Sequence, residues 1–302
     1  EDFTQWAKEH GIKICGVKAH EIPSHGIGIV ATRDLREGER VLFIPRSAMV
    51  TPASKGAKQL RLPEASSGQT RIAAYLTLSS QCEEFGFRDW QRTWPSIEAL
   101  QASIPFFWPV ELQSLLPPSA VALLKHQSLL ISESWRQVKH LVPKASKSRF
   151  LYYYFIINSR TMYWRDTDSG NHRSTSAANN LALCPFLDFL NHSPSCQPAT
   201  RTDQGYEIRT ERPYVAGEEI FVSYGAHGND FLLVEYGFLP EPGTNVWDSL
   251  SIDHFIIPAL STGQNDTLAR YGFLGDYTLF LGTPATEQPE PCFRTLVALF
   301  LI

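Results

Sequence analysis

The sequence has few cysteines, and their spacing excludes most structures that are built on this residue. The five cysteines lie far apart and form no C-x-x-C pair; they stand at Cys15, Cys82, Cys184, Cys196 and Cys292. An odd number of scattered cysteines favours neither a disulfide framework nor a structural zinc site. We therefore expect no bound metal and a reducing compartment, which places the protein inside the cell, in the cytoplasm or the nucleus.

Long apolar runs and a strong charge excess are also lacking. The apolar run at the C-terminus, LVALFLI, has seven residues, whereas a helix needs about 20 to span a bilayer. The N-terminal residues do not show the charged-then-apolar order of a signal peptide. The net charge is −4, with lysine and arginine spread along the chain, so no basic footprint for nucleic acid is present. We expect neither a membrane nor a nucleic acid as a direct partner.

The periodicity of the apolar residues predicts both helices and strands. With 302 residues, 43% of them apolar, the chain can bury about two domains and is not disordered. The predicted order is a helix over 2–10, a β-meander over 12–46, helices over 47–149, an aromatic helix ending near residue 160, a locally disordered polar loop over 165–180, two strands around a turn at 215–218, a short helix near 229–240, and helical segments over 246–302.

One apolar run contains polar residues that need an explanation. The segment LCPFLDFLNHSPSC, residues 183–196, reads as a buried strand that is interrupted by Asp188, Asn191 and His192. Burying one such group without a partner costs on the order of 1–3 kcal/mol. We expect the partners to be protein, water or a ligand. Taken alone, His192 is also typical of a core histidine whose ring nitrogens bond to the backbone, and it has no second ligand at metal spacing.

Two further motifs are weak when each is taken alone. GIGIVA, residues 26–31, has the glycines of a dinucleotide-binding turn, but a strand–turn–strand pattern follows it instead of the required helix. The glycines are then either ordinary turn residues or positions where the backbone approaches a ligand. The tyrosines of SYG, residues 223–225, and EYGF, residues 235–238, are equally typical of core residues with a solvated phenol.

The order of these motifs resembles that of the SET-domain protein methyltransferases, and in particular the Rubisco large-subunit methyltransferase-like group. An early G-x-G is followed by SR at 159–160, NH at 191–192, E-x-x-x-x-Y ending at Tyr224, and YGF at 236–238. The resemblance covers 12–46 and 150–240 directly. It implies an α+β fold: a SET domain with a pseudoknot over 1–46 and 150–245, a helical insertion over 47–149, and over 246–302 the start of a truncated helical substrate-binding domain.

The resemblance also assigns roles to individual residues. Tyr224 would be the catalytic tyrosine, and Tyr236 would line the methyl-transfer channel. S-adenosyl-L-methionine would be the cofactor, held by His25, Gly26, Ile27, Arg160, Asp188, Asn191, His192, Tyr236 and Phe238. In that arrangement Arg160 would neutralise the cofactor carboxylate and Phe238 would pack near the adenine. Met162 stands where the family commonly has an aromatic residue, which changes the expected shape of the substrate channel.

The implied activity is methyl transfer to a lysine side chain of a protein substrate. Transfer is an in-line displacement, so alignment can supply most of the catalysis. A lysine has an ordinary pKa near ~10.4, and a dry aromatic channel beside a cationic cofactor favours its neutral form. Two alternatives stay open: a catalytically silent SET domain that serves as a protein-binding module, and methylation of a protein histidine.

Overall fold

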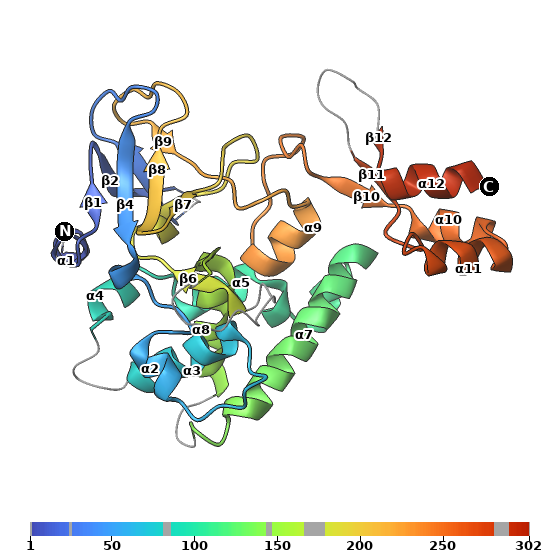
Figure 1. The fold of residues 1–302 in the computed structure, drawn as a ribbon, viewed down its shortest axis with the longest axis horizontal. Coiled ribbons are helices and arrows are strands. Elements are labelled where there is room, and N and C mark those ends of the chain that lie inside the picture. Colours follow the sequence, from blue (N-terminus) through green and yellow to red (C-terminus); the bar gives the residue numbers. More distant parts are fainter. Residues whose placement is uncertain are drawn as a thin grey trace.

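The computed structural model describes residues 2–23, 26–80, 86–142, 147–165, 179–280 and 290–301. The strands of the N-terminal half gather on one side of the molecule, and a layer of helices lies beneath them (Figure 1). Residues from about 246 onward extend away from this body and carry the C-terminus (Figure 1). Most of the buried apolar side chains form one core between the strands and the helices.

The described strands form several small sheets rather than one large sheet. The strand orders are β1-β4-β8-β7, β2-β3-β9, β5-β6 and β10-β11-β12. Their bounds are β1 Lys13–Ile14, β2 Val17–Ile22, β3 Gly26–Ala31, β4 Arg40–Pro45, β5 Thr161–Tyr163, β6 Leu181–Leu183, β7 Thr200–Thr202, β8 Gly205–Arg209, β9 Glu219–Ile220, β10 Ser249–Ser251, β11 Thr278–Phe280 and β12 Glu290–Pro291.

The predicted β-meander over 12–46 is correct in its strands but wrong in its pairing. Only β2 and β3 form a hairpin, which runs in register from Val17 opposite Ala31 to Ile22 opposite Gly26. β1 pairs with β4, and β4 also pairs with β8, which lies much later in the chain. β3 pairs with β9 on its other edge. In a local meander β3 and β4 would pair with each other, whereas here they pair with the later strands β9 and β8.

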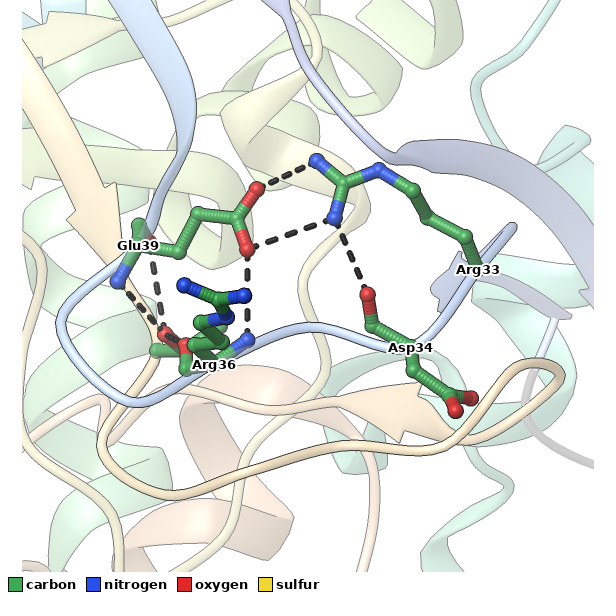
Figure 2. A network of polar contacts seen from close by, with 5 residues as sticks. Arg33, Asp34, Arg36 and Glu39 are labelled. Carbon is green, nitrogen blue, oxygen red and sulfur yellow. Dashed lines mark hydrogen bonds and ion pairs between the residues drawn. The ribbon is translucent and has the colours of Figure 1, made fainter.

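The turn between β3 and β4 is tied to the distant end of β8. Arg33 donates a hydrogen bond of 2.9 Å to the carbonyl of Asp34 and forms an ion pair with Glu39 (Figure 2). This guanidinium lowers the pKa of the Glu39 carboxyl. The backbone N–H of Glu39 donates to the hydroxyl of Thr210 across 2.9 Å. The turn therefore helps to place β4 against β8.

The helical region over 47–149 is present as the sequence predicted. The described helices are α1 Asp2–Glu9, α2 Lys55–Gln59, α3 Gly68–Ser79, α4 Arg88–Gln91, α5 Ile97–Ser103, α6 Val110–Gln113, α7 Pro118–Val138, α8 Lys147–Arg160, α9 Asn229–Phe231, α10 Asp253–Ala259, α11 Thr262–Arg270 and α12 Phe293–Leu301. Short 3₁₀ turns cover Arg46–Ala48, Pro105–Phe107 and Leu187–Phe189, and one π-helical turn covers Leu232–Tyr236.

Helix α8 is the centre of the helical layer and ends at Arg160, as predicted. Its buried residues include Phe150 and Phe155, which explains the aromatic composition of this segment. α3 packs against it, and the Thr70 hydroxyl of α3 donates to Ser134 of α7 across 2.8 Å in the buried interior. None of the described helices has both the length and the apolar character needed to cross a membrane.

The prediction that Asp188, Asn191 and His192 lie on one strand is wrong. β6 ends at Leu183, and Pro185, which lacks an N–H, follows shortly after it. The chain then makes a 3₁₀ turn over Leu187–Phe189, and only afterwards extends through the Asn191 segment. Of the polar loop predicted at 165–180, residues 166–178 lie outside the described residues.

The C-terminal residues are not purely helical, in contrast to the sequence-based expectation. β10, β11 and β12 form an antiparallel sheet, and α10, α11 and α12 lie beside it (Figure 1). Their small core is separate from the main one and consists of Ile252, Ile256, Leu260, Leu268, Tyr277 and Ala298. A separate core is consistent with a unit of its own, and the domain division at residue 246 remains a proposal.

Candidate functional site

A cavity of about 540 Å³ lies where the late strands meet the end of α8. Its walls come from segments that are distant in sequence: residues 159–163 at the end of α8 and in β5, residues 187–190, residues 198–199, and residues 222–224. Tyr224 and Tyr236 both line it, as the sequence motifs predicted for a common site. The cavity is therefore assembled by tertiary structure around two tyrosines.

The Tyr224 hydroxyl has a fixed direction at the cavity wall. It donates a hydrogen bond of 2.8 Å to the backbone carbonyl of Leu190. The ring lies 5.1 Å from the His192 ring and 5.0 Å from the Tyr236 ring, measured between centroids. Burial raises the pKa of the Tyr224 phenol above its ordinary value. The phenol is thus protonated at neutral pH, and its oxygen still has lone pairs with which to accept a hydrogen bond.

The Tyr224 segment is held by the Asn191 segment that runs beside it. The N–H of Val222 donates to the Asn191 carbonyl, and the N–H of Ser193 donates to the Val222 carbonyl, both across 3.0 Å. His192 and Val222 form a parallel bridge. This pairing satisfies backbone groups of the Asn191 segment and holds it beside the Tyr224 segment.

His192 is a neutral imidazole with one nitrogen free for a ligand. Its Nδ1 accepts the N–H of Tyr224 across 3.0 Å, which places the ring proton on Nε2. Burial, and then the neighbouring His227, lowers the pKa of His192 below its ordinary value. The Nε2 atom is buried and has no hydrogen-bond partner among the described residues. An unpartnered buried donor of this kind is expected to meet a ligand or water.

Asn191 connects the site to the first glycine strand. Its side-chain amide donates to Glu219 Oε1 across 2.7 Å. A Cβ built on Gly28 of β3 would lie 2.5 Å from that same oxygen and 3.1 Å from the Asn191 amide nitrogen. The strand that carries Gly26 and Ile27 therefore approaches the Asn191 segment closely because Gly28 has no side chain. His25 lies outside the described residues.

Arg160 and Asp188 form a second polar group on the cavity wall. An Arg160 Nη1 N–H donates to the backbone carbonyl of Asp188 across 2.7 Å, and the same nitrogen lies 3.8 Å from Asp188 Oδ2. The Asp188 side chain is fully buried and accepts a 3.0 Å hydrogen bond from the indole of Trp90. Burial raises the pKa of this carboxyl to about 6, although Arg160 acts in the opposite direction.

Tyr236 is positioned by a π-helical turn whose polar contacts the sequence did not reveal. Glu235 receives a 2.7 Å hydrogen bond from the Asn158 amide of α8 and a 3.0 Å hydrogen bond from Gln127 of α7. Gly237 then takes φ +79°, a left-handed conformation in which a Cβ would lie 2.8 Å from Ile104. This reversal brings the Phe238 ring within 6.0 Å of His192 and 6.3 Å of Tyr224.

The structure brings together most of the predicted site residues. Arg160, Asp188, Tyr224 and Tyr236 line the cavity itself. The rings of His192 and Phe238 lie beside Tyr224. Asn191 is bonded to Val222, two residues before Tyr224. Sequence reasoning missed Trp90, Asn158 and Gln127, which support the site from the helical layer. Their separations from their partners, 98, 77 and 108 residues, leave no local signal.

The free polar atoms of this site suit a small zwitterionic ligand. Beside His192 Nε2, the Nε of Arg160 and the Oδ1 of Asp188 are buried and unpartnered among the described residues. A guanidinium can neutralise a ligand carboxylate, and the imidazole N–H can donate to a ring nitrogen or hydroxyl. Within the described residues no group of three or more metal-ligating side chains is found.

Comparisons with known proteins agree on one family. The model of the SET domain matches residues 26–225. The ribosomal lysine N-methyltransferase set11 of Schizosaccharomyces pombe is 27% identical over 305 residues, covering 98% of this chain and 73% of that protein. An actin-histidine N-methyltransferase of Drosophila melanogaster is 22% identical over 294 residues, covering 89% of this chain and 54% of that protein. Among solved structures, Rubisco LSMT bound to AdoMet superposes with a TM-score of 0.67 at 18% identity, covering 94% of this chain and 68% of that one.

Proposed function

This chain belongs to the SET-domain family, and on that premise we propose that it transfers the methyl group of S-adenosyl-L-methionine to the side-chain amine of a lysine in a protein substrate. The observation that carries the proposal is the Tyr224 hydroxyl, held on the Leu190 carbonyl at the wall of a cavity that Arg160 also lines. S-adenosyl-L-methionine, when bound, supplies a methyl group on a positively charged sulfur, which is a strong electrophile.

The polar group around Arg160 and His192 fits the cofactor. The Arg160 guanidinium would neutralise the cofactor carboxylate, and Asp188 would hold that guanidinium in place. The Nε2–H of His192 and the amide of Asn191 would bond to polar groups of the nucleoside, and Phe238 would pack on the adenine. Gly26 and Ile27, at the start of β3, would offer backbone groups to the methionine portion.

The aromatic cavity fits a lysine side chain. The Tyr224 and Tyr236 rings, 5.0 Å apart, would enclose the aliphatic stem. A buried position beside a cationic cofactor favours the neutral amine, which is the nucleophile. The carbonyl of Leu190 and the hydroxyl of Tyr224 lie 2.8 Å apart and would orient the amine for in-line attack. Met162 lines the same cavity and would widen or reshape it relative to an aromatic residue.

The remaining assignments follow from the same proposal. We assign residues 1–46 and 150–245 to the catalytic domain, 47–149 to an insertion within it, and 246–302 to a substrate-binding domain. We also place the protein inside the cell, in the cytoplasm or nucleus, because the described cysteines Cys15, Cys184, Cys196 and Cys292 are all free thiols. A protein substrate rather than nucleic acid agrees with the net charge of −4.

A radiolabel experiment tests the proposed function. The chain should melt at a higher temperature with S-adenosyl-L-methionine present, because a ligand that binds only the folded state stabilises it. Tritium from the labelled cofactor should then be transferred to a protein of a cell lysate, and mass spectrometry should locate the methyl group on lysine. Methylation of histidine would instead favour the activity named for the Drosophila relative, and cofactor binding without transfer to any protein would favour a silent binding module.

A further inference from the structure

The residues that line the cavity over Tyr224 divide into a buried floor and an exposed rim. Leu187, Leu190, Tyr206 and Val222 are buried. The exposed lining residues are Tyr163, Arg165, Pro198 and Arg201, and these therefore mark the side from which a substrate enters. Two of the four rim residues are arginines, although the chain as a whole carries a net charge of −4.

Arg201 is fixed at the rim by its position on β7. It lies opposite Tyr206 of β8 in the antiparallel register, so that the two side chains share one face of the sheet. Its guanidinium carbon stands 5.7 Å from the centre of the Trp164 ring, within the range of a cation–π contact. Trp164 is 5% exposed and thus provides a rigid support.

Arg165 belongs to the same exposed rim and is adjacent to that tryptophan in sequence. It follows Trp164 directly, two residues after the end of β5, and β5 itself lines the cavity. The Trp164 N–H donates to the Asn180 carbonyl across 2.9 Å, which anchors the backbone just before Arg165. The rim therefore carries two guanidinium groups: that of Arg201, which lies over the Trp164 ring, and that of the residue next to Trp164 in sequence, Arg165.

Neither guanidinium has a carboxylate within ion-pair distance in the part of the chain that the structure describes. Glu207, the acid on the neighbouring strand, lies 3.0 Å from Arg209 and 3.7 Å from Arg40 instead. Asp188 is the one acidic residue in the described lining, and it is buried against Arg160 and Trp90. The positive charge of the rim is thus available to a partner.

We propose that Arg165 and Arg201 select a substrate segment in which acidic residues stand close to the methyl-acceptor lysine. This inference rests on the proposed function, since it takes the cavity over Tyr224 as the entrance for that lysine. An acceptor lysine that enters alone meets two cations at the rim and is repelled. A flanking aspartate or glutamate neutralises that repulsion and gains a charge-assisted hydrogen bond from a guanidinium. The rim therefore discriminates against substrate segments in which basic residues flank the acceptor lysine.

Peptide binding measures this selectivity without requiring turnover. Three fluorescent peptides, each with one central lysine, would carry glutamate, glutamine or lysine on both sides of it. Anisotropy titrations in the presence of S-adenosylhomocysteine should give the tightest binding for the glutamate peptide, roughly tenfold tighter than the glutamine peptide at low salt. Added salt should reduce this difference, because the rim charges are exposed.

Charge reversal provides the matched comparison. Arg165→Glu combined with Arg201→Glu should invert the order, so that the lysine-flanked peptide binds best, while Arg270→Glu on α11, outside the cavity lining, should leave the order unchanged. Equal binding of the three peptides by the natural protein, or binding of none, would overturn the proposal. So would tighter binding of a short single-stranded DNA than of the glutamate peptide, since this would identify the rim as a nucleic-acid contact.

The proposed function fails on a different result. If the chain neither binds S-adenosyl-L-methionine nor transfers its methyl group to any protein, the proposed function is wrong. This holds whichever of the three peptides binds most tightly. A chain that methylates protein lysines but shows no preference among the three peptides contradicts only the role of the two arginines. Folding of the double variant is checked by its melting temperature with and without cofactor, since both side chains are exposed and the cofactor residues are unchanged.

Discussion

The hydroxyl of Tyr224 donates a hydrogen bond to the backbone carbonyl of Leu190 across 2.8 Å. The two residues are 34 positions apart, and they meet because the segments on which they lie pair side by side. The arrangement fixes a protonated phenol beside a carbonyl oxygen at the wall of the cavity. Both oxygens can accept hydrogen bonds from an incoming amine.

Replacing Tyr224 with phenylalanine should remove the orienting hydroxyl while keeping the ring. We expect the single-turnover rate of methyl transfer to fall by roughly 10²–10³, because an oriented contact made at the transition state is lost. Cofactor affinity, measured by calorimetry, should change little, since the ring still packs against His192 and Tyr236. A variant with the natural rate on a verified substrate would show that Tyr224 is not the catalytic residue.

Asn191→Ala should affect binding rather than the chemical step. The substitution removes the amide that bonds to Glu219 Oε1 and the proposed contact to the cofactor. Losing one hydrogen bond to a charged, part-buried group costs on the order of 1 kcal/mol or more of the free energy of unfolding. Calorimetry should show weaker cofactor binding, and thermal melts should show lower stability. Asn265→Ala is the control and should leave cofactor affinity unchanged, because α11 lies in the C-terminal part that extends away from the main body (Figure 1) and does not line the cavity.

Gly28→Ala tests the close approach of β3 to the Asn191 segment. The added methyl group would stand 2.3 Å from Ile22 Cδ1 on β2, 2.5 Å from Glu219 Oε1 and 3.1 Å from the Asn191 amide nitrogen, so these side chains must shift. We expect both the melting temperature and the cofactor affinity to decrease. Gly263→Ala is a matched control, because a Cβ there meets no atom within 4 Å. Equal cofactor affinity of the two variants would argue against a role for the β3 strand in the site.

Asp188 should give the protein a pH dependence of stability with a definite sign. Burial raises the pKa of its carboxyl from the ordinary 3.8 to about 6 in the folded protein. Between these two values the folded state holds a proton that the unfolded chain has released, so this group's contribution to the free energy of unfolding decreases as pH rises. A shift of about two units corresponds to roughly 3 kcal/mol.

Asp188→Asn removes that titration while keeping an oxygen that can accept the Trp90 hydrogen bond. The difference in melting temperature, variant minus natural protein, should therefore become more positive from about pH 4 to about pH 7. The substitution also weakens the interaction with Arg160. That effect shifts the difference in melting temperature by the same amount at every pH and does not alter its dependence on pH. A difference that stays constant over this range would mean that the carboxyl does not titrate there.

Removal of metal ions should leave the activity unchanged. The proposed chemistry needs no Lewis acid, because alignment of the amine and the electrophilic methyl group supplies the catalysis. Methyl transfer measured before and after dialysis against a chelator should agree within error. Stoichiometric zinc in the purified protein, lost together with the activity, would contradict this expectation.

The sequence determined the local structure well where the signal is local. Aromatic and apolar spacing predicted α8 and its end at Arg160. The turn-forming residues at 23–26 predicted the β2–β3 hairpin. The order of short motifs identified the family and pointed to Tyr224 and Tyr236, which do line one cavity. These features depend on side-chain patterns that a continuous stretch of chain carries with it.

Only the tertiary structure decided which segments become neighbours. The sequence suggested one strand for Asp188, Asn191 and His192, but Asp188 lies in the 3₁₀ turn over Leu187–Phe189 and is buried beside Trp90, whereas the other two follow in an extended segment. In the same way, β4 and β3 pair with β8 and β9 rather than in a local meander. Such contacts join residues nearly a hundred or more positions apart, and their free energy comes from burial and hydrogen bonds that exist only once the chain has folded.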